Sequence, residues 1–176
     1  MEENTLESTY LSKNIITRAY FRAKVFAAIK LAKIKKQDVI LDFGCGGGWL
    51  EKKLKNFNIK GYDINPNKTF IKDYRKIKPD KIFVLDVFEH IPPREIEKIV
   101  SEFKKMNRRF ELIVSIPTEN VISRKVRKFV GKPEVPKEHI TRYSDILRVL
   151  KKNFKLKNKI NFFTVSHLLK FEHRKN

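Results

Sequence analysis

Short apolar runs along the chain predict the strands of a sheet. The four clearest are VILDF at 39–43, IKGYD at 59–63, KIFVLDV at 81–87 and ELIVSI at 111–116. The first is a brief apolar run that ends in a glycine cluster, which is how a buried parallel strand enters a tight turn. The tail over 155–173 predicts two further strands joined by a short connection.

Segments with helical spacing lie before and between these runs. The first extends from about 11 to 35 and carries apolar residues at helical intervals, namely Ile15, Phe21, Val25, Phe26 and Ile29. The most regular stripe follows Pro92 and Pro93, which suit a first helical turn, and it comprises Ile96, Ile99, Val100, Phe103 and Met106.

Three more helices are expected. One follows the glycine cluster, with Trp49, Leu50 and Leu54 on its apolar side. A basic helix is expected over about 121–130. The last is expected to start at Ser144 as its N-cap, with Ile146, Leu147 and Leu150 facing inward.

This alternation of strands and helices predicts an α/β fold. We expect a doubly wound, mostly parallel sheet of six or seven strands with helices on both faces. The chain of 176 residues has the length of one ordinary domain. An N-terminal arm is expected over 1–10 and a single domain over 11–176.

The apolar stretches and the cysteine count favour a soluble protein of the cytoplasm. No apolar stretch approaches the ~20 residues that span a bilayer, and the polar start is unlike a signal peptide. Cys45 is the single cysteine, so no intramolecular disulfide is expected. The four histidines are scattered without zinc-ligand spacing, so no metal site is expected either.

The chain is strongly basic. It has 40 Lys and Arg residues against 20 Asp and Glu residues, a formal net charge of +20. Such an excess points to a polyanionic partner, an anionic membrane surface or an anionic substrate. A compositional origin competes with these interpretations, because lysine, isoleucine and asparagine are used heavily throughout the chain.

The candidate chemistry begins at the segment DFGCGGG, residues 42–48. Glycines without Cβ atoms allow the backbone to turn sharply and to lie against a bulky ligand. A dinucleotide fingerprint counted from Gly44 requires glycine where Trp49 stands, and a phosphate loop requires Gly-Lys followed by Ser or Thr. The acidic residue before the loop suits a cationic ligand better than a pyrophosphate.

The segment D-x-G-x-G-x-G after a first strand resembles the first motif of class I S-adenosylmethionine-dependent methyltransferases. Asp63, at the end of the second predicted strand, is similar to the acidic residue that binds the ribose hydroxyls in that family. LDVFEHI at 85–91, SIPTEN at 115–120 and HITRYS at 139–144 resemble its small-molecule and lipid branches. The resemblance covers roughly residues 12–155 and implies a Rossmann-like fold with S-adenosyl-L-methionine as the cofactor.

The resemblance also implies roles for single residues. At the cofactor it places Asp42, Gly44, Cys45, Gly46, Gly48, Asp63, Ile64 and Asp86. Asp42 can face the ammonium group of the cofactor, and Asp63 can accept hydrogen bonds from two ribose hydroxyls. Asp86 and His90 are the candidate catalytic residues, with His90 a possible general base because histidine exchanges protons near neutral pH. Asp42, Asp63 and His90 each also have a purely structural alternative as a turn, cap or loop residue.

The region after the second predicted strand is shorter than the family pattern. Phe83 follows Asp63 by 20 residues (83 − 63), where the family places a helix, a third strand and a connection. The third strand normally supplies an acidic residue to the adenine amino group, and Asp73 is the candidate here. His139, just before a predicted helix, can project over the site or only stabilise its loop.

Three functions therefore compete. The resemblance favours methyl transfer to a small-molecule, lipid or glycan-type acceptor, whereas the net charge favours an RNA methyltransferase. The shortened region favours a non-catalytic cofactor-binding protein on a reduced scaffold. The signatures for methylating a base amine or cytosine C5 are missing. The basic run ISRKVRKFVGK at 122–132 can contact an anionic membrane or RNA, or form a solvated face.

Overall fold

A computed structural model of the protein describes residues 15–118 and 139–174. Its strands are β1 (Val39–Phe43), β2 (Asn58–Tyr62), β3 (Lys81–Leu85), β4 (Arg109–Pro117), β5 (Lys155–Phe162) and β6 (Ser166–Arg174). Its helices are α2 (Ile15–Ala32), α3 (Trp49–Lys53), α4 (Pro93–Met106) and α6 (Tyr143–Asn153), with 3-10 turns η1 (Tyr74–Lys76) and η2 (Phe88–His90). None of these helices is long and apolar enough to cross a membrane.

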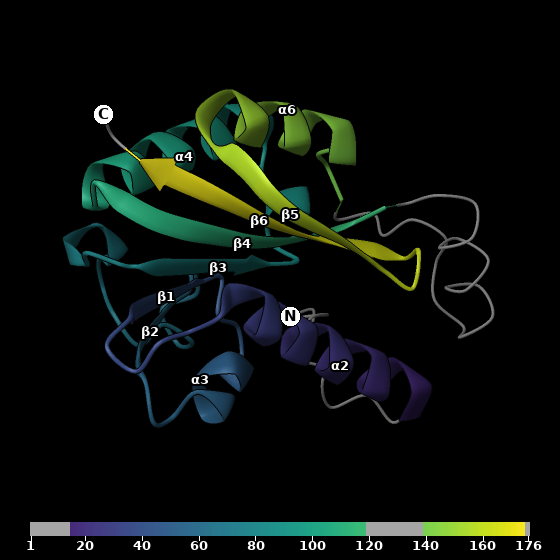
Figure 1. The fold of residues 1–176 in the computed structure, drawn as a ribbon, viewed down its shortest axis with the longest axis horizontal. Coiled ribbons are helices and arrows are strands. Elements are labelled where there is room, and N and C mark those ends of the chain that lie inside the picture. Colours follow the sequence, from purple (N-terminus) through teal and green to yellow (C-terminus); the bar gives the residue numbers. More distant parts are fainter. Residues whose placement is uncertain (1–14, 119–138, 175–176) are drawn as a thin grey trace.

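The six strands form one sheet in the order β2-β1-β3-β4-β6-β5 (Figure 1). The first four are mutually parallel, and β6 pairs antiparallel with both β4 and β5. In Figure 1, α4 and α6 cover one face, and α2 and α3 cover the other. The predicted doubly wound, mostly parallel α/β sheet is confirmed, with six strands in the described part of the chain.

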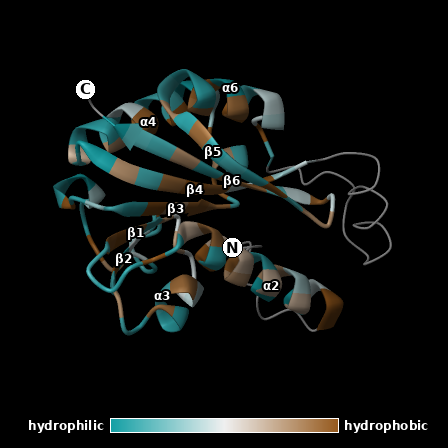
Figure 2. Cartoon of the chain, in the orientation of Figure 1, coloured by the Kyte–Doolittle hydropathy of each residue, from teal (hydrophilic) through white to brown (hydrophobic). Residues whose placement is uncertain are grey.

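Two hydrophobic clusters hold these layers together. Side chains alternate along each strand, so Ile82 and Val84 of β3 pack under α4 and α6, whereas Phe83 packs under α2 and α3. Figure 2 shows the apolar residues concentrated along the central strands and polar residues over much of the outer helix surface. The continuous apolar runs of the sequence arise because the central strands are buried on both faces.

One detail of the predicted helices is wrong. The helix after residue 140 begins at Tyr143 and has Arg142 as its N-cap, so Ser144 lies inside the first turn and does not cap it. The first predicted helix is present as α2, which turns Lys24, Val25 and Ala28 inward and leaves Phe26 exposed. The arm 1–10, the basic helix at 121–130 and the basic run 122–132 lie outside the described residues.

The segment between β2 and β3 contains no strand, only the turn η1. The predicted loss of a third strand is therefore confirmed, and β2 is an edge strand of the sheet. Phe70 occupies part of that edge, because its N–H donates to the carbonyl of Gly61 at 3.0 Å. Phe70 thus makes one of the backbone hydrogen bonds that a neighbouring strand would otherwise make with β2.

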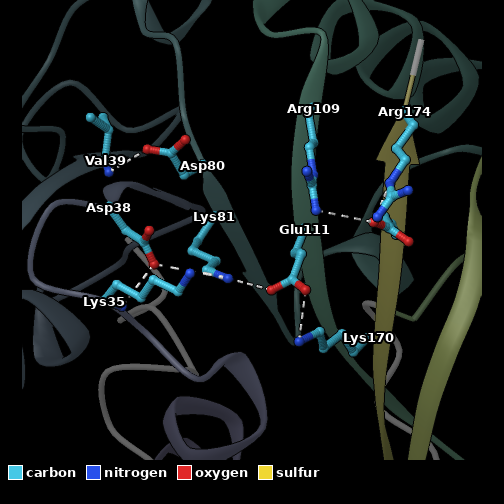
Figure 3. Close-up of polar contacts among 10 residues, drawn as sticks. Lys35, Asp38, Val39, Asp80, Lys81, Arg109, Glu111, Lys170 and Arg174 are labelled. Carbon is cyan, nitrogen blue, oxygen red and sulfur yellow. Dashed lines mark hydrogen bonds and ion pairs between the residues drawn. The ribbon is translucent and has the colours of Figure 1, made fainter. Parts of the chain in front are cut away.

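At the end of the sheet where the parallel strands begin, charged side chains form ion pairs with one another. Lys81 forms an ion pair with Glu111 and lies 3.9 Å from Asp38, while Lys170 lies 2.8 Å from Glu111 (Figure 3). In parallel α/β sheets, ligands bind at the opposite end, beyond the carboxyl ends of the strands. The carboxyl end of this sheet carries the glycine loop after β1, Asp63 after β2 and Asp86 after β3.

Candidate active site

The glycine loop is anchored at its start and open at its centre. The N–H groups of Gly44 and Cys45 both donate to the carbonyl of Tyr62, at 2.7 and 3.0 Å. A Cβ at Gly44 would lie 2.4 Å from a methyl carbon of Val87, whereas a Cβ at Gly46 would meet nothing within 4 Å. With φ values of +81° and +51°, both positions favour glycine, but only Gly46 faces open space.

Asp63 links the loop to the end of β2. Its Oδ2 accepts a hydrogen bond from the N–H of Gly46 at 2.9 Å, and its Oδ1 accepts one from the N–H of Asn65 at 2.9 Å. Asp63 therefore does have the structural role of a turn residue that the sequence analysis gave as an alternative. Each carboxylate oxygen keeps a second lone pair, so Asp63 can also accept bonds from two hydroxyls.

Apolar side chains stand beside this carboxylate. Ile64 is 92% exposed and Phe70 is 64% exposed, although both are large hydrophobic residues. The ring of Phe70 lies against Gly48, where an added Cβ would be 3.0 Å from it, and it also packs on Gly61. Sequence reasoning missed Phe70, whose signal is an isolated aromatic residue in the segment that replaces the third strand.

Asp42 forms a buried acidic pair with Glu51 of α3 beneath the loop. Burial, reinforced by the nearby charges of Glu51 and Asp63, raises the pKa of Asp42 well above its usual range. Burial likewise raises the pKa of Glu51 to about 6. Both carboxylate oxygens of Glu51 are buried without a hydrogen-bond partner among the described residues, which adds to the cost of charging this pair of carboxyls. Glu51 was not predicted, because in the sequence it resembles a solvated helix residue.

This acidic pair should make the stability of the protein depend on pH. A carboxyl with a raised pKa holds its proton longer in the folded state, so its contribution to the free energy of unfolding falls as the pH rises from about 4.5 through about 6. Replacing Glu51 with Gln should remove this loss. Between about pH 5 and pH 7.5, the free energy of unfolding of the variant should rise by about 1 kcal/mol relative to that of the wild type, a value reduced for a partly exposed group. Urea unfolding at both pH values measures it.

The matched control is Glu95→Gln, which neutralises an exposed carboxylate on α4. Because the whole chain gains positive charge on acidification, the comparison is the difference between each variant and the wild type. A pH profile of Glu51→Gln that runs parallel to that of the wild type would contradict the raised pKa of Glu51.

The remaining two candidates near the loop already have partners. The Sγ of Cys45 lies 3.6 Å from the carbonyl of Lys68, and burial raises the pKa of its thiol, so it packs as a neutral side chain. Asp73 caps η1, and its carboxylate accepts bonds from the backbone and side chain of Arg75 at 3.1 and 2.8 Å. The predicted contact of Asp73 with adenine stays a prediction.

Asp86 is held at the end of β3 by two buried partners. Its Oδ1 accepts a hydrogen bond from the hydroxyl of Ser115 at 2.7 Å, and its Oδ2 pairs with the ammonium of Lys24. Burial alone lowers the pKa of Lys24, but the charges of Asp86 and Tyr20 more than offset this, so the pKa of Lys24 is raised. Both carboxylate oxygens of Asp86 thus have partners, which supports a positioning role beside the site.

Turn η2 and the start of the described 139–174 segment bring two histidines together. The ring centroids of His90 and His139 are 5.0 Å apart at an angle of 81°. The carbonyl of Glu89 accepts bonds from the N–H groups of Ile140 and Thr141, at 2.9 and 3.2 Å. These two bonds bring His139 to the carboxyl end of β3. This position is compatible with the prediction that His139 projects over the site.

Comparisons with known proteins agree on the family. The sequence model of a family described as "Methyltransferase domain" matches residues 15–159. No curated protein matches the sequence. Among solved structures, magnesium protoporphyrin IX methyltransferase from Synechocystis PCC 6803, with bound S-adenosylhomocysteine, is similar with a TM-score of 0.67 and 19% identity, covering 91% of this chain and 88% of that one.

Two further structures widen the range of acceptors among similar folds. The N-methyltransferase NodS from Bradyrhizobium japonicum WM9 has a TM-score of 0.66 at 12% identity, covering 89% of this chain and 98% of that one. The small RNA methyltransferase HEN1 has a TM-score of 0.63 at 19% identity, covering 89% of this chain and 26% of that one. At these identities the likeness concerns the fold, whereas the family match spans most of the chain. The chain therefore belongs to the S-adenosylmethionine-dependent class I methyltransferases.

Proposed function

We propose that the protein transfers a methyl group to a small-molecule, lipid or glycan-type acceptor that binds beside η2. The observation that carries the proposal is that Gly46 opens into space at the same edge of the sheet where His90 and His139 meet. Magnesium protoporphyrin IX methyltransferase, whose acceptor is a small molecule, has a similar fold, which supports this class of acceptor. A cytoplasmic location and a single domain over 11–176 belong to the same proposal.

The residues at the glycine loop fit S-adenosylmethionine. When bound, this cofactor supplies an electrophilic methyl group on a sulfonium. Asp63 has free lone pairs for the ribose hydroxyls, and the exposed Ile64 and Phe70 offer apolar surface to the adenine. The acidic pair Asp42 and Glu51 lies beneath the loop as counter-charge for the ammonium and sulfonium. His90 remains the proposed catalytic residue, whereas Asp86, which the sequence also suggested for catalysis, is proposed as a positioning residue because both its oxygens have protein partners.

Replacing Asp63 with Ala should weaken cofactor binding by about 1.5–3 kcal/mol, because hydrogen bonds to a charged acceptor are lost. Isothermal titration calorimetry with S-adenosylmethionine and S-adenosylhomocysteine on the full chain measures both affinities. Since Asp63 also holds Gly46 and Asn65, Asp63→Asn serves as the matched variant that keeps the shape and removes the charge. Unchanged affinity in Asp63→Ala would contradict the ribose contact.

Replacing Gly46 with Val should abolish cofactor binding, with some loss of stability because valine is strained at a φ of +51°. A side chain there meets no protein atom within 4 Å, so it projects into the space proposed for the cofactor. Gly44→Ala is the comparison, because its Cβ would collide with Val87 and should lower the melting temperature instead. Calorimetry and thermal melts separate the two effects. A Gly46→Val protein that binds the cofactor normally would place the cofactor elsewhere.

The proposed activity is tested by methyl transfer from labelled S-adenosylmethionine to panels of hydroxylated, aminated and lipid acceptors. Cofactor binding should also raise the melting temperature, because a ligand that binds only the native state stabilises it. Transfer to at least one acceptor, abolished by Gly46→Val, is the expected result. Failure to bind either form of the cofactor would overturn the proposal in favour of a scaffold without this activity.

An RNA acceptor is the second candidate, supported by the net charge of +20 and by the similar fold of HEN1. Non-specific binding of RNA or anionic vesicles falls steeply with salt, because it depends on counterion release. A preference for one structured RNA that survives about 0.2 M salt, and weakens when Arg124 and Arg127 are replaced by Glu, would favour RNA over a small molecule.

A further inference from the structure

We propose that Glu89, His90 and His139 form a binding site for a divalent transition-metal cation of the zinc type. One ligand atom from each of the three side chains lies within 4.8 Å of the other two. Tetrahedral zinc with bond lengths of ~2.0–2.1 Å holds its ligand atoms ~3.3 Å apart. The three side chains therefore need to close by at most about 1.5 Å, which small rotations about their side-chain bonds can provide.

Backbone contacts build this site from two distant parts of the chain. Turn η2 follows β3 directly and presents Glu89 and His90 from consecutive positions. The segment that begins at His139 is tied to the turn by both N–H bonds to the carbonyl of Glu89. The hydroxyl of the buried Thr141 adds a bond to the carbonyl of Ile91 at 2.6 Å. The three ligands thus sit on backbone that is already held in place.

The electrostatics of the neighbourhood are compatible with a cation. Glu89 is only 2% exposed, and a buried carboxylate is stable when it is paired or when it coordinates a metal. Among the described residues, Lys24 carries a positive charge that acts electrostatically with Glu89, and its ammonium is bound to Asp86.

The ligand set selects the kind of metal. Two imidazoles and one carboxylate suit zinc and its transition-metal neighbours, whereas magnesium and calcium prefer sites made of oxygen ligands. Three protein ligands leave a coordination position open for water or for another oxygen or nitrogen donor. His90 and His139 are both partly exposed, so the position can be reached from solvent.

The location of the site gives it a role that rests on the proposed function. The cluster lies at the carboxyl end of β3, where we place the acceptor, so a bound cation could hold the acceptor through an oxygen or nitrogen atom. With the cation bound, His90 acts on the acceptor as a metal ligand in place of the general-base role proposed above, and His90→Ala is expected to lower turnover in either role. The sequence predicted no metal site, because the two histidines lack zinc-ligand spacing and only the fold brings them together.

Zinc binding to the full chain, measured by calorimetry without cofactor or acceptor, tests the inference. We expect one zinc ion per chain, at least about tenfold weaker binding in His90→Ala and in His139→Ala, and much weaker binding of magnesium. Cobalt should give the visible absorption of a site with nitrogen ligands. The control is His167→Ala, a partly exposed histidine of β6 outside the cluster, which should bind zinc as the wild type does.

The outcomes separate this inference from the proposed function. Thermal stabilisation by S-adenosylhomocysteine shows that each variant is folded, which matters because the backbone just after His139 is hydrogen-bonded to η2. Zinc affinity that is unchanged in both histidine variants, or absent from a wild type that binds the cofactor, would overturn the metal site alone. Specific zinc binding in a protein that binds no cofactor would support the metal site and overturn the proposed function.

Discussion

Replacing Lys24 with methionine is expected to lower the free energy of unfolding by about 3–5 kcal/mol, because it leaves the carboxylate of Asp86 buried without its cation. Lys24 is 2% exposed, and its ammonium also lies 4.3 Å from the centre of the Phe21 ring. Methionine keeps most of the length of the side chain. The fall in the free energy of unfolding therefore measures the loss of the charge and not the creation of a cavity. Urea unfolding at neutral pH measures it.

Two further variants make this result specific. Arg22→Met removes an exposed cation from the same helix and should cost less than about 1 kcal/mol. Adding Asp86→Asn to Lys24→Met should recover part of the lost stability, because no unpaired charge then stays buried. If Lys24→Met is as stable as Arg22→Met, the buried ion pair does not hold α2 to the end of β3.

Replacing His90 with alanine is expected to lower turnover by roughly 10²–10⁴ while leaving cofactor affinity nearly unchanged. His90 lies on η2 beside His139, whereas the cofactor contacts that we propose come from the loop after β1 and from the end of β2. Single-turnover methyl transfer with an acceptor found in the panel, together with calorimetry for the cofactor, measures the two quantities separately.

The control for His90 is again His167→Ala, which should keep both cofactor affinity and turnover. Rescue of turnover by imidazole in His90→Ala would favour direct participation of the ring. A parallel fall in cofactor affinity and turnover would assign His90 to support of the cofactor site and contradict its catalytic role.

Much of the fold was predictable because it depends on local patterns. The strand predicted at 81–87 contains the apolar run at 82–85, and the helix that follows Pro92 and Pro93 has a regular apolar stripe. A strand buried on both faces appears in the sequence as an apolar run, and a helix buried on one face appears as apolar residues at intervals of three or four. The missing third strand was also predictable, because too few residues separate Asp63 from Phe83.

The sequence did not indicate which side chains of α2 are buried. Phe26 belongs to the apolar residues at helical spacing, yet the helix buries Lys24 and leaves Phe26 exposed. The reason is tertiary, because Asp86 at the end of β3 offers a buried partner that only a cation can use. Glu51 was missed for a related reason, since its partner Asp42 lies across the glycine loop.

The sequence alone determined the order of strands and helices and the loop at Gly44 and Gly46, because residues close together in the chain create these features. The meeting of His139 with Glu89 and His90, and the contact of Phe70 with the edge of β2, follow from the three-dimensional arrangement alone. Such contacts depend on how parallel strands are ordered in the sheet, and that order brings together residues that no local pattern relates.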